Sequence, residues 1–105
     1  MVRHISVFIF KNVPEKEENI RRVRAFLDTL PDICPLVKNQ TIAGPAAPTP
    51  TLPKEAPTVF GDLVQVCDFD SVADAGAYPM SDAHDKLAQL ASPLLQKVIV
   101  IDYEQ

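Results

Sequence analysis

The second half of the chain contains the stretch FDSVADAGAYPMSDAHDKL, residues 69–87. Two serines in it, Ser71 and Ser81, belong to the residue types that most often cap helix N-termini. Pro79 lies between them and disfavours helical geometry at the preceding residue, Tyr78. The stretch therefore predicts a short helix from residue 72 towards Tyr78, a break, and a second helix that runs from Ser81 to about Leu90.

The second helix carries an ionisable ring on its apolar face. Residues on one face of a helix recur at spacings of three and four, and this spacing joins His84, Leu87, Ala88, Ala91 and Leu95. His84 is therefore expected to point inward, about one and a half turns beyond Tyr78. A neutral imidazole can remove a proton next to a carbonyl, and a phenol can donate a hydrogen bond to the enolate oxygen that forms. The alternative is that both side chains only satisfy buried hydrogen bonds.

Composition favours one globular domain over residues 1–105. The chain is 47% hydrophobic and 23% charged, with a net charge of −4, which argues against nucleic acid or an anionic membrane as a partner. The N-terminus lacks the layout of a signal peptide, and no apolar run reaches membrane-spanning length. Cys34 and Cys67 fit neither a metal-binding spacing nor a disulfide framework. We therefore expect buried thiols, a cytoplasmic location, and no metal, haem or nucleotide cofactor.

The order of the predicted elements defines the fold class. Strands are expected over residues 2–11, 37–43, 62–69 and 98–103, and a long helix from Pro14 to Leu30 is expected to end at Pro31. The order strand, helix, strand, strand, helix, strand is typical of the ferredoxin-like βαββαβ fold, an α+β fold with a four-stranded antiparallel sheet and its helices on one face. The proline-rich segment 44–58 is expected to be irregular, as a lid, a dimer arm or a plain loop.

The first strand is apolar on both faces, so both faces need a cover. Its β-branched side chains, Ile5, Val7 and Ile9, are expected to pack under the helices. The other face, which includes Phe8 and Phe10, would then require a second subunit. We therefore expect a homodimer held by the sheet face that bears these two phenylalanines.

Four segments together resemble the stress-responsive dimeric A/B barrel (Dabb) family. They are RHISVFIFK at residues 3–11, FDSV at 69–72, Tyr78 followed by Ala83-His84, and VIDYE at 100–104. The resemblance covers nearly the whole chain. It implies a homodimeric α+β barrel with a cavity between helices and sheet.

The resemblance also implies roles for individual residues. A plant branch of olivetolic acid cyclase-like proteins, which are cofactor-free polyketide cyclases, is similar at Tyr78 and His84, and its strand histidine matches His4. The implied ligand-binding residues are His4, Ser6, Phe8, Leu63, Gln65 and Val100. The family's usual His-Pro-Ala-His reads Ser81-Asp82-Ala83-His84 here, and Leu63 replaces a frequent histidine, so the cavity is lined differently.

Three functions remain open from the sequence. The first is a cofactor-free acid–base enzyme, such as a polyketide cyclase, isomerase or decarboxylase, that acts on a small aromatic or carbonyl compound. The second is a non-catalytic, stress-associated dimer that binds a small hydrophobic molecule. The third is a monooxygenase of the haem or quinol type, which the lack of a basic cluster near His84 disfavours for haem.

Overall fold

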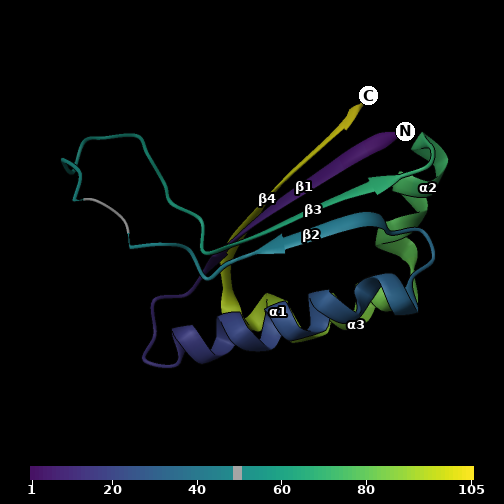
Figure 1. Ribbon diagram of the computed structural model, residues 1–105. Coiled ribbons are helices and arrows are strands. Elements are labelled where there is room, and N and C mark those ends of the chain that lie inside the picture. The colour runs from purple at the N-terminus through teal and green to yellow at the C-terminus, as the bar shows by residue number, and fades with distance from the viewer. Residues whose placement is uncertain (49–50) are drawn as a thin grey trace.

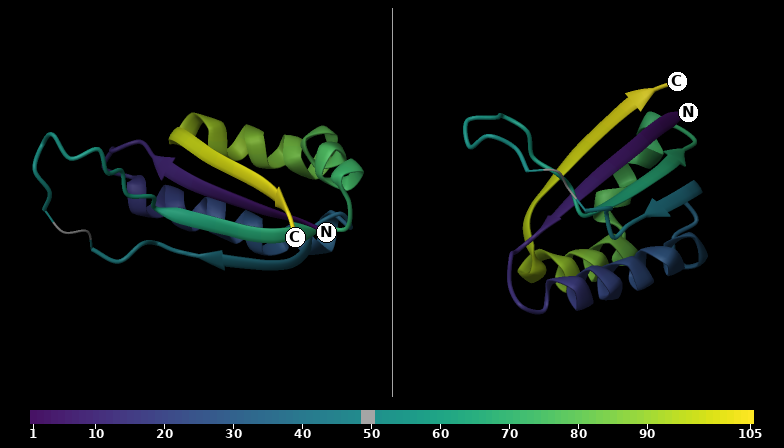
Figure 2. Two further views of the ribbon diagram at one scale, coloured as in Figure 1. Left: turned by 90° about the horizontal axis from the view of Figure 1, so that it is seen from above. Right: turned by 60° about the vertical axis from the view of Figure 1, so that its left-hand side comes forward.

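The computed structural model describes residues 1–48 and 51–105 and contains one antiparallel sheet with all helices on one face (Figures 1 and 2). Pro50, within the segment expected to be irregular, lies outside the described residues. In chain order the elements are β1 (Val2–Phe10), α1 (Lys16–Ile33), β2 (Lys38–Ala43), β3 (Leu63–Phe69), α2 (Val72–Ala77), the 3-10 turn η1 (Tyr78–Met80), α3 (Asp82–Ala91), the 3-10 turn η2 (Ser92–Leu94) and β4 (Leu95–Glu104). The strand order β2-β3-β1-β4 confirms the predicted ferredoxin-like fold.

Local capping divides the helical region as the sequence predicts. The Ser71 hydroxyl accepts a hydrogen bond from the backbone N–H of Asp74 at 3.1 Å, and the Ser81 hydroxyl accepts one from the N–H of His84 at 3.2 Å. Each bond satisfies a donor that the first helical turn leaves free. The turn η1, which includes Pro79, separates the two helices and holds Tyr78 between them.

The long helix α1 continues past the proline that was expected to end it. Pro31 lies inside the helix, which runs on to Ile33. A proline at this position cannot donate to the carbonyl of Leu27, four residues earlier. The Gln40 side chain donates to that carbonyl instead, at 2.7 Å. The prediction was wrong because a partner from β2 satisfies the freed acceptor and the helix is not interrupted.

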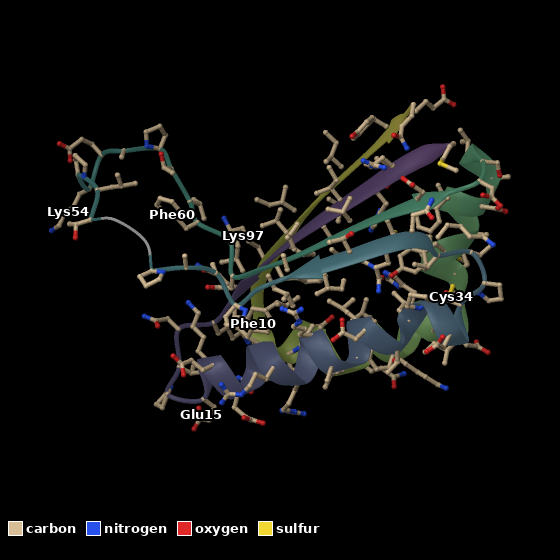
Figure 3. All side chains as sticks on the ribbon, in the orientation of Figure 1. Phe10, Glu15, Cys34, Lys54, Phe60 and Lys97 are labelled. Carbon is tan, nitrogen blue, oxygen red and sulfur yellow. The ribbon has the colours of Figure 1, made fainter. Side chains whose placement is uncertain are left out.

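The two faces of the sheet are the reverse of those expected. His4, Ser6, Phe8 and Phe10 are buried on the face that the helices cover, whereas Ile5 and Val7 are only partly buried on the open face. Figure 3 places Phe10 between the sheet and α1. Phe8 and Phe10 therefore cannot form a dimer interface. Side-chain alternation separated the two faces correctly, but it does not say which one meets the helices.

The core lies between the sheet and the helices. The predicted stripe of α1, namely Ile20, Val23, Leu27 and Leu30, is buried there. Cys34 and Cys67 are buried free thiols, as predicted. No helix within the described residues is long and apolar enough to cross a membrane.

The described parts of the proline-rich segment, residues 44–48 and 51–58, project beyond the end of the sheet (Figure 1). Its base is fixed, because the Ala46 N–H donates to the Asp62 carbonyl at 3.0 Å and the Arg24 side chain donates to the Gly44 carbonyl. Figure 3 shows Lys54 out on this segment, away from the helices, and Phe60 on the connection that returns to β3.

Candidate active site

A cavity of about 130 Å³ lies between the sheet and α3. Its walls come from β1, β3, β4, η1, α3 and η2, and none of its lining residues within the described chain comes from segment 44–58. Val98 and Val100 are 44% and 50% exposed in the single chain, so the side at β4 opens to solvent. The lining residues are His4, Ser6, Phe8, Gln65, Tyr78, His84, Leu87, Ala88, Ala91, Ser92, Leu95, Val98 and Val100.

Tyr78 places a polar group without a partner in the cavity wall. Its side chain is only 2% exposed, and its hydroxyl has no hydrogen-bond partner among the described residues. Burial raises the pKa of Tyr78 to about 12, and the nearby Gln65 amide opposes this rise only in part. The Gln65 amide does not form a hydrogen bond to the hydroxyl. The phenol therefore stays protonated at neutral pH, and its O–H is free to donate a hydrogen bond. Buried polar groups without partners are rare, and a bound ligand is one explanation for such a group.

His84 lies directly beside this phenol. The two rings are 5.0 Å apart between centroids and meet edge to face, with 83° between their planes. Burial lowers the pKa of His84 below its ordinary value; the Asp85 charge opposes that shift and His4 adds to it. The imidazole is therefore neutral at pH 7 and can accept a proton. It enters the cavity from the first turn of α3, the turn that Ser81 caps.

His4 is the centre of a short chain of hydrogen bonds. Its Nδ1 lies 2.6 Å from an Asp102 carboxylate oxygen on β4, and its Nε2 lies 2.8 Å from the Ser6 hydroxyl. The strand register explains the arrangement, because His4 and Asp102 are direct cross-strand partners and Ser6 is two residues further along β1 on the same face. The His4 ring also packs against Tyr78, with centroids 5.6 Å apart.

Gln65 is held in a fixed orientation by a second chain of hydrogen bonds. Its Nε2 donates to Gln40 Oε1 at 2.9 Å, and Gln40 in turn donates to the backbone of α1. Gln65 faces Ser6 across the pair β1–β3 and is only 1% exposed. A polar side chain so placed can orient a ligand without moving.

The structure brings most of the singled-out residues to one place. Tyr78, His84 and five of the six residues implied as ligand-binding line the cavity. The exception is Leu63, which is buried in the core and does not line it. Leu63 lies at the first position of β3. Its implied ligand contact stays a prediction.

Sequence reasoning missed Asp102 as part of the site. Two signals could have found it: the two-residue spacing of His4 and Ser6, and the antiparallel pairing of the first and last strands, which sets Asp102 opposite His4. The partners of a strand become known only with the register, so the spacing alone was not sufficient.

Neither metal nor thiol chemistry has an evident place in this cavity. Among residues 1–48 and 51–105, no three His, Cys, Asp or Glu side chains lie close enough together to hold a metal ion. Burial raises the pKa of the Cys67 thiol to about 12, and the charge of Asp68 adds to that shift, so Cys67 is a poor nucleophile. The cavity is also small for a haem, since ligand pockets typically measure about 300–1,000 Å³. The expectation of no cofactor stays a prediction.

The fold and the cavity between its helices and sheet define a class, the ferredoxin-like α+β barrels. Residues 2–105 match the family described as the Stress responsive A/B Barrel Domain, and the chain belongs to this family. No curated protein matches the chain by sequence.

Solved structures share the fold at low sequence identity. A dimeric protein of ferredoxin-like fold from Bacteroides fragilis superposes with a TM-score of 0.79 at 18% identity, covering 99% of this chain and 95% of that one. A hydroxynitrile lyase from Passiflora edulis has a TM-score of 0.76 at 24% identity, covering 97% and 90%. An antibiotic biosynthesis monooxygenase has a TM-score of 0.66 at 12% identity, covering 100% and 98%. Similarity at these identities shows the fold and leaves the chemistry open.

Proposed function

We propose that this protein is a cofactor-free acid–base enzyme that acts on a small carbonyl or aromatic compound in the cavity. One observation carries the proposal: a buried phenol with an unused hydrogen-bond donor stands beside a neutral imidazole in the same cavity wall. An unsatisfied buried polar group costs about 1–3 kcal/mol. A substrate oxygen that accepts from Tyr78 would remove that cost.

The roles follow from the two ionisation states. His84 removes a proton from the substrate, and Tyr78 donates to the oxygen on which negative charge develops. Gln65 orients the ligand from the sheet, and Phe8 and Val100 contact its apolar part. Cyclisation and isomerisation of carbonyl compounds begin with such a proton removal and pass through an enolate-like oxygen. Decarboxylation of a β-keto acid forms the same oxygen by loss of CO₂, without proton removal, so it tests Tyr78 rather than His84.

The cavity volume limits the substrate. An apolar cavity of about 150 Å³ holds benzene, and this one measures about 130 Å³. A single small ring or a short carbonyl chain fits inside one protomer, whereas a long polyketide chain would extend past Val98 and Val100 into solvent. We therefore place small β-keto acids and aromatic ketones ahead of polyketides. Because one similar structure is a hydroxynitrile lyase, aromatic cyanohydrins belong in the first substrate panel.

The test combines substrate turnover with two variants. Wild-type protein is assayed for decarboxylation, for exchange of protons next to the carbonyl in deuterated water, and for cyanohydrin cleavage. His84→Ala should lower the rate of proton exchange by about 10²–10⁴-fold, and Tyr78→Phe should lower it less, because it removes one hydrogen-bond donor while keeping the ring. Circular dichroism shows whether each variant is folded.

Two outcomes would contradict acid–base catalysis. One is a His84→Ala protein that retains wild-type turnover. The other is a wild-type protein that turns over no member of the panel but binds small aromatic ligands with equal affinity in both variants. The second result would favour the non-catalytic ligand-binding dimer.

We also propose that the chain forms a homodimer through the open sheet face. That face carries the partly buried Ile5, Val7, Val64 and Val66 and the half-exposed Ile99 and Ile101. Contiguous apolar surface of this kind usually marks an interface. The structural relative from Bacteroides fragilis is described as dimeric, which supports a second copy of the chain as the occupant.

A further inference from the structure

His4 and Ser6 line the cavity and, with the half-exposed Asp102 behind them, form a second set of reactive groups that acid–base chemistry at His84 does not use. Ser6, His4 and Asp102 form a continuous chain of hydrogen bonds, with Ser6 Oγ 2.8 Å from His4 Nε2 and His4 Nδ1 2.6 Å from Asp102 Oδ1. Serine, histidine and aspartate connected in this order form the arrangement that activates a serine hydroxyl for attack on an acyl carbon.

The chemistry of the partners fixes where the protons lie. A carboxylate only accepts hydrogen bonds, so an imidazole with a single proton carries it on Nδ1 when it contacts Asp102. This leaves a lone pair on Nε2, to which the Ser6 hydroxyl donates. His4 is thereby held in the tautomer and orientation of a general base for Ser6, and Asp102 is the positioning residue.

The serine is also accessible and has a donor nearby for the oxyanion. Ser6 and His4 both line the cavity, although each is buried from bulk solvent. The free hydroxyl of Tyr78 lies in the same wall, on a ring 5.6 Å from that of His4 between centroids. The Tyr78 hydroxyl therefore remains an unused donor in the wall of the cavity that Ser6 also lines.

We propose that Ser6 is an acyl-accepting nucleophile for small esters or thioesters, with an acyl group no larger than about one ring. The proposal depends on the cavity being the substrate site, as in the proposed function, but not on His84. Ser6 Oγ bonds to the carbonyl carbon as its proton passes to His4 Nε2, and the carbonyl electron pair moves to the oxygen that Tyr78 contacts. Collapse expels the alkoxide or thiolate, which takes the proton from His4. Water then attacks the acyl carbon on Ser6 while its proton passes to His4 Nε2. Collapse releases the acid, and Ser6 takes the proton back.

The experiment uses the full chain and p-nitrophenyl acetate. We expect a burst of nitrophenolate and, after an acid quench, an acetyl group located on Ser6 by peptide mass spectrometry. Ser92 lines the same cavity and lies outside the hydrogen-bonded chain, so it is the internal control for non-specific acylation. Ser6→Ala should remove the adduct, and Ser6→Cys should restore an adduct as a thioester.

The variants of the other two residues separate catalysis from structure. His4→Gln should slow acylation by about 10²–10⁴-fold. Asp102→Asn should lower kcat for acylation while KM stays unchanged, and Asp102→Glu should recover part of the loss, which a structural role would not predict. An acetyl group on Ser92 or on other surface residues instead of Ser6, or equal labelling of wild type and His4→Gln, would overturn the proposal.

The two proposals fail separately. Proton exchange that depends on His84, without a Ser6 adduct, removes the acylation proposal and leaves the role of His84 intact. A Ser6 adduct without proton exchange removes the role of His84 as a base and leaves the acylation proposal intact.

Discussion

The chemistry proposed at the scale of single residues depends on His84 being neutral. The cavity wall and Tyr78 keep water from part of its ring, and this burial lowers its pKa. A lowered pKa means that the folded protein binds the His84 proton more weakly than the unfolded chain does. Both activity and stability therefore depend on pH in the same direction at this residue.

The first prediction concerns that pH dependence. We expect kcat/KM to fall as pH drops through the lowered pKa of His84, with a midpoint below the ordinary value of about 6.5. Stability from the neutral ring is complete above about 6.5 and is lost as pH falls towards the folded pKa. NMR titration of the His84 ring signals, compared with the pH–rate profile, provides the measurement. A midpoint at or above the ordinary value in both would contradict this assignment.

Periodicity in the sequence was sufficient to place His84 but not all of its neighbours. The spacing along α3 turned the ring inward, and the serine cap fixed where the helix begins, because both are local properties of the chain. Asp102 and Leu63 depend on strand register and on which side chains fill the core beneath α1. Those are long-range properties, so local sequence could not place either residue.

At the scale of secondary-structure elements, α1 depends on β2 for its last turn. The Leu27 carbonyl has no helical donor because residue 31 is proline, and Gln40 on β2 is its partner. The same glutamine accepts from Gln65 in the cavity wall. The helix end, the edge strand and the site are therefore connected by one side chain.

The second prediction tests this connection. Gln40→Ala should lower the free energy of unfolding by about 1–3 kcal/mol, because it leaves a partly buried carbonyl without a donor. In a Pro31→Ala background the same change should cost less, since the substituted residue has a backbone N–H that can donate to that carbonyl. The lost contact with Gln65 is common to both backgrounds and cancels in the cycle. Additive effects in urea unfolding would show that Gln40 does not replace the missing helical bond.

The error in assigning the sheet faces also belongs to this scale. The β-branched side chains of Ile5 and Val7 suggested that their face lies under the helices. However, β1 is apolar on both faces, so either face could be the buried one. The helix-covered face instead carries the polar His4 and Ser6 because it forms a cavity wall. The alternation of side chains and the order of the elements could be predicted from local sequence pattern. The choice of the helix-covered face could not, because polar side chains lie there in place of the more hydrophobic set.

At the scale of the whole molecule, a single layer of helices leaves one of the two faces of the sheet uncovered. Ile99 and Ile101 on the open face are 51% and 55% exposed in the single chain. Stable interfaces bury about 800 Å² per partner, and a four-stranded sheet offers a face of that order. A second copy of the chain would cover this surface and leave the helix-side cavity of each protomer in place.

The last prediction is that the protein is a dimer held by this face. Light scattering at micromolar concentration should give about twice the 11.6 kDa of one chain. Ile101→Glu should shift the mass towards one chain, because it places a charge in an apolar interface without altering the covered side of the sheet. Val72→Glu is the matched control: Val72 is 62% exposed on α2, outside the sheet, and the same charge there should leave the dimer intact. A wild-type protein with the mass of one chain, or equal masses for the two variants, would show that the open face has another role.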